Sequence, residues 1–233
     1  MSASYYTTRA IVIDQTPWRE IDVRLEVCTA ERGLQEYLVR SGRSMSSKLR
    51  PHALVFDRTI LTVATRGGAK YITQARLEQR LQIDSALLTR QRAAAVACAL
   101  VRLARTDLTD APRLFRALDS LLIDINQRRQ DFLIPLLALV TQILELSGVV
   151  PLLGECQTCH RRIAPTDTLV FALGEGAIFH QICSHPFGSE PLPLALWSRL
   201  CAVLASNTIG TDQAVFQWLV RFAKYHLEAK NIV

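Results

Sequence analysis

The chain has 233 residues, 49% of them hydrophobic, and a formal net charge of +6, which together indicate an ordinary globular protein of one or two domains. Six cysteines are too few for a disulfide-stapled scaffold of this length, and the N-terminus has no apolar run like that of a secretory signal. We therefore expect a reducing, cytoplasmic compartment.

The first third of the chain has the two-residue periodicity of strands. The pattern occurs in five runs, at residues 9–14, 20–29, 34–42, 52–65 and 69–77. In the second run apolar and polar residues alternate from Ile21 to Val27, which predicts a half-buried strand with Cys28 on the polar side. Five short strands in about eighty residues fit a small closed barrel, and the OB-fold has this strand count and a face that binds oligonucleotides.

Positive charge is concentrated in this same region. Residues 1–80 carry 13 Lys and Arg against 8 Asp and Glu, whereas residues 81–233 carry 14 against 13. A basic surplus on one domain is typical of proteins that bind phosphate backbones, although a surplus of this size also fits a solvated surface.

From about residue 82 the apolar spacing becomes helical. It predicts helices over residues 85–105, 112–127 and 132–148, then around 193–206 and from Thr211 onward. Asp131 is the candidate N-cap of the third helix, which should end near Gly148. That helix is the longest apolar stretch, but it falls short of the roughly 20 residues that span a bilayer and contains Glu145. We expect a buried core helix there and no membrane anchor.

Two short motifs then place metal-ligand residues at zinc-ribbon spacing. Cys156 and Cys159 form a Cys-x-x-Cys pair, and His180 and Cys183 repeat the same two-residue gap after a predicted hairpin. Four such ligands suit a tetrahedral zinc ion, and a site closed by four protein ligands is structural.

The fourth ligand position stays open at this point. His160 and His185 also lie close to the cysteines and either could replace His180. The pattern still favours a single structural zinc ion over unmetallated thiols.

Enzymatic readings of the chain are weaker. The cysteine pair follows a helix and a turn, whereas a thioredoxin-like pair opens a helix in a βαβ unit. A zinc deaminase would need a His-x-Glu motif, and the sequence contains none. It also lacks a phosphate-binding loop with the Gly-Lys-Ser/Thr ending and a Gly-x-Ser-x-Gly motif. We therefore expect a protein that is not an enzyme.

Taken in order, these motifs resemble the bacterial RecO family of recombination mediators. The resemblance rests on the predicted barrel, the loop SGRSMSSKLRP at residues 41–51, the stretch LLALVTQILELSGVVPLLGECQTC at residues 136–159, and the second knuckle. Two departures stand out: His180 occupies a position where many members have cysteine, and the C-terminal EAKNIV lacks a Lys-Ser-containing tail.

The resemblance implies an α+β, multi-domain protein. An OB-fold over residues 1–80 would bind single- and double-stranded DNA, and a helical domain over residues 81–233 would carry an inserted zinc ribbon at about 154–187. It also implies annealing of complementary strands coated by single-strand binding protein, RecA loading together with RecR, and a cytoplasmic, nucleoid-associated location. The alternative is a zinc-ribbon and OB-fold protein that binds RNA or a protein partner.

The expected site residues come from this resemblance and from the positions of basic residues in the predicted barrel. The expected phosphate contacts are Arg40, Arg43, Lys48, Arg50, Arg66 and Lys70. The expected zinc ligands are Cys156, Cys159, His180 and Cys183. Bases would stack on barrel aromatics such as Tyr37, Phe56 or Tyr71.

Overall fold

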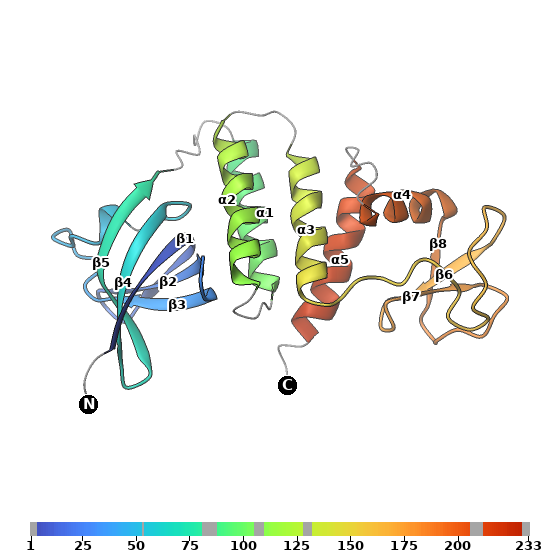
Figure 1. The fold of residues 1–233 in the computed structure, drawn as a ribbon, viewed down its shortest axis with the longest axis horizontal. Coiled ribbons are helices and arrows are strands. Elements are labelled where there is room, and N and C mark those ends of the chain that lie inside the picture. The colour runs from blue at the N-terminus through green and yellow to red at the C-terminus, as the bar shows by residue number, and fades with distance from the viewer. Residues whose placement is uncertain are drawn as a thin grey trace. The chain divides into compact units, whose positions relative to one another are not determined.

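A computed structural model gives the fold in two units, Met1–Gln130 and Asp131–Val233. The residues that it describes are 4–52, 54–80, 88–104, 110–127, 132–205 and 212–229. The first unit holds the strands β1 to β5 and the helices α1 and α2, and the second holds α3 to α5 and β6 to β8 (Figure 1).

Five strands of the first unit close into a barrel. They are β1 (Ser4–Trp18), β2 (Asp22–Thr29), β3 (Gly33–Val39), β4 (Arg58–Arg66) and β5 (Ala69–Gln79). The strand order is β1-β2-β3-β5-β4, and all neighbours are antiparallel except β3 and β5, which pair in parallel at Leu38 and Tyr71. A closed five-stranded barrel with this order is an OB-fold, so the predicted fold class is confirmed.

Strand β2 shows how the sequence pattern builds this barrel. Val23, Leu25 and Val27 all point into its core. The prediction was wrong at both ends of the run. Ile21 is 53% exposed because it precedes the first residue of β2, and Cys28 is buried although the alternation placed it on the polar side.

The predicted strand over residues 52–65 is shorter in the structure. A 3-10 turn, Arg50–His52 (η1), precedes β4, and Phe56 adopts a left-handed backbone with φ of 72°. The turn is fixed on the barrel because the Phe56 N–H donates to the Val12 carbonyl at 2.8 Å. Nearby, the buried Asp57 carboxylate pairs with Arg80 at 3.1 Å. Pro51 has no N–H to donate to a neighbouring strand, and Asp57 is held by its ion pair with Arg80. Both features favour a turn here over a continuous β-strand.

Helices α1 (Leu88–Leu103) and α2 (Ala111–Asn126) belong to the same compact unit as the barrel. Helix α2, predicted from its helical apolar spacing, buries one stripe of apolar side chains: Leu114, Phe115, Leu118, Leu121, Leu122 and Ile125. Arg58 of β4 pairs with Asp119 of α2 at 2.6 Å, and Arg102 of α1 pairs with Glu26 of β2 at 2.9 Å. The first compact unit therefore extends to residue 130 and includes α1 and α2.

The second unit combines three helices with a small sheet. The helices are α3 (Leu133–Leu146), α4 (Leu194–Leu204) and α5 (Gln213–Ala229). The sheet has the order β7-β6-β8, from β6 (Leu169–Ala172), β7 (Ala177–His180) and β8 (Glu190–Leu192). The predicted N-cap Asp131 and the predicted helix start at Thr211 lie outside the described residues. No helix in the described part of the chain is long and apolar enough to cross a membrane.

Candidate nucleic-acid interface and metal centre

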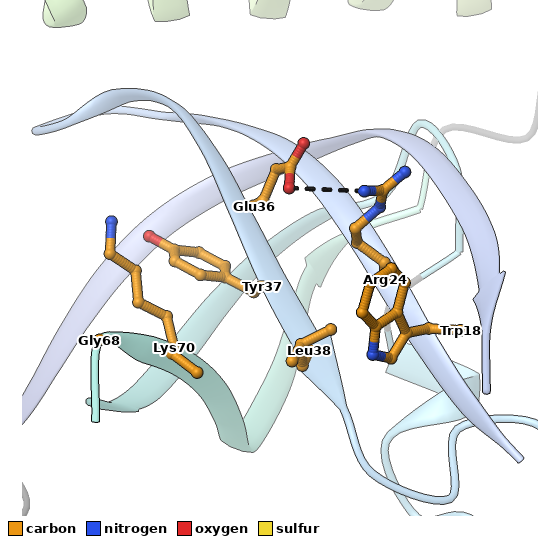
Figure 2. Close-up of a pocket in the computed structure, with 8 residues that line it drawn as sticks. Trp18, Arg24, Glu36, Tyr37, Leu38, Gly68 and Lys70 are labelled. Atoms are coloured by element: carbon orange, nitrogen blue, oxygen red, sulfur yellow. Dashed lines mark ion pairs between the residues drawn. The ribbon is translucent and has the colours of Figure 1, made fainter. Parts of the chain in front are cut away.

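Three of the predicted phosphate contacts lie around the β4–β5 turn and the end of β3. The Arg40 guanidinium carbon lies 4.6 Å from the centre of the Tyr71 ring. Both residues line a cavity of about 200 Å³ together with Arg66 and the exposed Tyr5. The parallel pairing of β3 with β5 brings these residues together, because it places the end of β3 beside the start of β5. Lys70, on β5, lines a neighbouring cavity, shown in Figure 2.

The remaining predicted contacts lie in the loop after β3. The Arg43 backbone N–H donates to the Ile21 carbonyl at 2.9 Å, and its guanidinium donates to the Glu20 carbonyl at 3.1 Å. These bonds place Arg43 beside the β1–β2 turn. Lys48 is exposed, and the side chain of Arg50 lies outside the described residues.

The predicted stacking platforms need one correction. Tyr37 is fully buried, with its hydroxyl hydrogen-bonded to that of Tyr6 at 3.2 Å, so its ring offers no exposed face for stacking. Tyr37 points inward because successive side chains of β3 lie on opposite faces of the sheet, and position 37 lies on the core face. Sequence reasoning also missed two exposed aromatics on the barrel, Tyr5 at 60% and Trp18 at 40%. Both lie near the ends of β1, beyond the run of alternation that predicted this strand.

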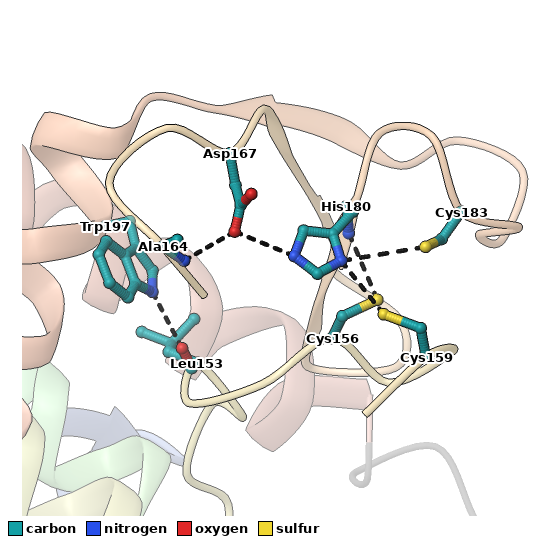
Figure 3. Close-up of polar contacts among 8 residues, drawn as sticks. All are labelled: Leu153, Cys156, Cys159, Ala164, Asp167, His180, Cys183 and Trp197. Atoms are coloured by element: carbon teal, nitrogen blue, oxygen red, sulfur yellow. Dashed lines mark hydrogen bonds and ion pairs between the residues drawn. The ribbon is translucent and has the colours of Figure 1, made fainter. Parts of the chain in front are cut away.

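In the second unit, the structure brings together the four predicted metal ligands. Their ligand atoms, in Cys156, Cys159, His180 and Cys183, all lie within 4.8 Å of one another (Figure 3). Tetrahedral zinc with bonds of 2.0–2.3 Å would set such atoms about 3.5–3.8 Å apart. The Cys159 sulfur is already 3.3 Å from His180 Nδ1, and the Cys183 sulfur is 3.9 Å from it. The cluster can therefore close around one ion with small movements.

Backbone hydrogen bonds hold the two knuckles in this arrangement. The first knuckle turns tightly because the His160 N–H donates to the Cys156 carbonyl at 2.8 Å, with His160 in the left-handed region. The second turns where the Cys183 N–H donates to the His180 carbonyl at 3.0 Å. A bond of 3.2 Å from Gln157 to the Ile178 carbonyl joins the first knuckle to β7.

The orientation of His180 is fixed from its other ring nitrogen. Nε2 lies 3.1 Å from an Asp167 carboxylate oxygen, which also accepts the Ala164 N–H at 2.7 Å. With a proton on Nε2, the unprotonated Nδ1 faces the sulfurs. Metal-ligating histidines commonly have such a carboxylate partner.

The other candidate histidines lie apart from the sulfurs. His160 is 71% exposed at its side chain and lies 3.7 Å from Glu155. His185 is exposed and faces the Pro186 carbonyl at 3.4 Å. The cluster that could hold a metal ion therefore contains His180 and neither of them.

The local electrostatics favour the thiolate, the metal-binding form of cysteine, at two of the three cysteines. The backbone N–H and the guanidinium of Arg161 hydrogen-bond Cys159 and lower the pKa of its thiol to about 6. Burial raises the pKa of Cys156, but backbone N–H groups, those of Cys159 and His180 among them, outweigh it and leave the pKa lowered. Burial and the neighbouring sulfurs raise the pKa of Cys183 to about 11. A cation at the centre would offset this accumulated negative charge.

Comparison with known proteins covers nearly the whole chain. Residues 1–80 match the family model described as Recombination protein O N terminal, and residues 88–231 match the one described as Recombination protein O C terminal. A DNA repair protein RecO of Dehalococcoides mccartyi is 28% identical over 188 residues, which are 80% of this chain and 73% of that protein. A DNA repair protein RecO of Lactobacillus delbrueckii subsp. bulgaricus is 25% identical over 221 residues, 91% of this chain and 85% of that protein. The chain therefore belongs to the RecO family.

Proposed function

We propose that this chain is a DNA-binding recombination mediator that acts in DNA repair and makes or breaks no covalent bond. The two family models and the names of the relatives support the role in repair. The observation that carries the binding function is the gathering of Arg40 and Arg66 around one cavity, with Lys70 on the same strand as Tyr71.

The chemistry of this surface suits a polyanion. Arginine guanidinium groups donate several hydrogen bonds to phosphate oxygens, and each neutralised phosphate releases a condensed counterion. Affinity for DNA should therefore fall steeply with salt. A cationic surface that holds two strands also reduces their mutual repulsion and raises their local concentration, so it can accelerate annealing.

Annealing of strands coated by single-strand binding protein, and assistance to RecA loading together with RecR, belong to this proposal. Their support is the family membership alone.

The metal cluster has a separate proposed role. We propose that Cys156, Cys159, His180 and Cys183 hold one structural zinc ion. Zinc would supply a covalent-like crosslink between the first knuckle and the β6–β7 hairpin. Four protein ligands leave no position for water or substrate, which argues for a structural and against a catalytic role.

An annealing assay tests the DNA-binding proposal. Complementary single strands coated with single-strand binding protein are mixed, and duplex formation is followed by fluorescence. The wild-type chain should accelerate annealing, and Arg40→Glu combined with Arg66→Glu should abolish the acceleration. Lys224→Glu, an exposed charge reversal on α5 of the other unit, is the matched control and should anneal like wild type.

The same assay also tests the alternative function. An RNA- or protein-binding module would leave DNA annealing at the uncatalysed rate in wild type and in both variants. Unchanged acceleration in the double reversal would show instead that DNA binds at another surface.

A further inference from the structure

A second cavity on the barrel is lined by an aromatic ring, apolar side chains and charged groups of both signs. Its volume is about 360 Å³, and it is formed by the end of β1, by β2 and β3, and by the β4–β5 turn. Its lining residues are Trp18, Arg24, Glu36, Tyr37, Leu38, Gly68, Ala69 and Lys70. Small-ligand sites in proteins start at about 300 Å³, so this cavity has room for one nucleobase and its sugar.

Trp18 is the aromatic wall of this cavity. Its side chain is held from one direction by Arg24, whose guanidinium carbon lies 5.5 Å from the ring centre. Figure 2 shows Arg24 against Trp18, with Glu36 reaching toward the guanidinium at 3.8 Å. Arg24 Nε also donates to Thr16 at 3.4 Å. Trp18, 40% of whose residue surface is exposed, thus presents its ring at the edge of the cavity.

The cavity has a group that can recognise the edge of a base as well as cations that can hold a phosphate. Arg24 and Lys70 are cationic, and Glu36, paired with Arg24 at 3.8 Å, has a carboxylate that is 65% exposed. The same carboxylate can accept an N–H from the edge of a base. Leu38 and Ala69 supply apolar surface for the base ring. An aromatic ring, an apolar wall and an acceptor together fit a flat heterocycle that carries N–H groups.

We propose that this cavity binds one unstacked base of a single DNA strand and thereby makes the barrel prefer single strands to duplex. This inference rests on the proposed DNA binding, since the phosphates beside the base would be held by the neighbouring basic residues, Lys70 among them. In a duplex, the faces of each base are stacked and its pairing edge is bonded to the partner strand. A duplex can therefore reach the arginines but cannot fill the cavity.

The test compares affinity for a single strand and for a duplex of the same sequence, by fluorescence anisotropy over a range of salt concentrations. Trp18→Ala should weaken single-strand binding by about 5- to 150-fold, the usual loss for one stacked base. Its duplex binding should stay within about twofold of wild type. Stacking releases no counterions, so the salt dependence of single-strand binding should keep its slope. Trp18→Phe should restore most of the affinity, and Ile21→Ala, an exposed neighbour outside the cavity, should change neither substrate.

Tryptophan fluorescence gives a second readout. Single-stranded DNA should quench part of the wild-type emission, and this part should disappear in Trp18→Phe although binding is retained. The other two tryptophans, Trp197 and Trp218, lie in the second unit and report its integrity.

The outcomes separate the two proposals. Equal loss of single-strand and duplex affinity in Trp18→Ala, or no loss of either, overturns the base-binding cavity while DNA binding by the arginines stands. Absence of DNA binding in wild type overturns the proposed function itself, and full binding by the Arg40 and Arg66 reversal overturns the assigned DNA-binding surface. A circular dichroism melt of each variant shows whether Trp18→Ala has unfolded the barrel. If it has, two milder variants test the cavity instead. Loss of fluorescence quenching in Trp18→Phe, or a lowered preference for single strands in Glu36→Gln, supports the cavity. If neither change is seen, the base-binding cavity is overturned.

Discussion

An Asp167 carboxylate oxygen lies 3.1 Å from His180 Nε2, on the side of the imidazole ring away from the three cysteine sulfurs. The same carboxylate is held by the Ala164 N–H. His180 therefore has a partner that fixes its tautomer and ring orientation. In other metal sites the loss of such a partner lowers metal affinity by about 10- to 100-fold.

Asp167→Ala is expected to weaken zinc binding by about that factor, and Asp167→Asn by less, because the amide keeps an acceptor for the imidazole N–H. Competition with a chromophoric chelator measures the affinity. Glu155→Gln is the matched control, since Glu155 contacts His160 and not a ligand. Equal affinity of all four proteins would show that the carboxylate has no part in metal binding.

Removal of one ligand should remove the metal. Cys156→Ser protein, purified without chelator, should contain far less than one zinc per chain by elemental analysis, whereas Cys201→Ser should retain the wild-type amount. Structural zinc contributes about 10–16 kcal/mol of apparent binding free energy in small zinc domains, so its loss should open the knuckles. Hydrogen exchange should then accelerate at residues 154–187 and remain slow in the barrel. Stoichiometric zinc in Cys156→Ser would contradict the proposed ligand set.

The cysteines should differ sharply in reactivity. Burial raises the pKa of both Cys28 and Cys98 to about 12, so at pH 8 only about one thiol in ten thousand is ionised at either position. Alkylation of the folded protein followed by mass spectrometry should leave both unmodified. Chelation should expose Cys159 to the reagent, while Cys28 stays protected until denaturant is added. Rapid modification of Cys28 in the folded protein would contradict the burial of β2 under its neighbours.

The ion pairs of Arg58 should stabilise the packing of α2 on the barrel. The guanidinium bridges Glu78 at 3.1 Å and Asp119 at 2.6 Å, and all three side chains are about one-fifth exposed. Arg58→Ala leaves two carboxylates without this partner, and we expect a loss of about 1–3 kcal/mol in the free energy of unfolding. Urea denaturation measures it. Arg221→Ala, which breaks an exposed pair with Glu190, should cost no more than about 1 kcal/mol.

Glu26 gives a pH-dependent prediction. Burial raises its pKa, and the opposing attraction of Arg102 does not cancel the effect. Because the folded-state pKa lies above the unfolded value, ionised Glu26 destabilises the fold at neutral pH, and this penalty disappears as the pH falls through the folded-state pKa. Glu26→Gln should therefore be the more stable protein at pH 7, and the difference should shrink toward pH 4. A constant difference across this range would mean that ionisation of Glu26 is not its cause.

Local patterns in the sequence predicted most of the elements. Alternation in β2 and the apolar stripe of α2 were reliable because each reflects burial of one face of a regular element. The prediction failed at residues 52–57, where a proline and the buried Asp57 produce a turn, and it missed β8, a three-residue strand too short to show a period.

The sequence by itself determined the ligand types and the two-residue gaps of the metal cluster, since both are properties of short, contiguous motifs. It also determined that positive charge is concentrated in the first eighty residues. Only the tertiary structure decided that His180, and neither His160 nor His185, faces the sulfurs, because that choice depends on Asp167 and on the register of the β6–β7 hairpin. In the same way, the cavity at Trp18 exists because strand pairing brings β1, β3 and β5 together from positions about fifty residues apart. Side chains that meet through such long-range pairing share no local pattern, so their proximity becomes visible only in the folded chain.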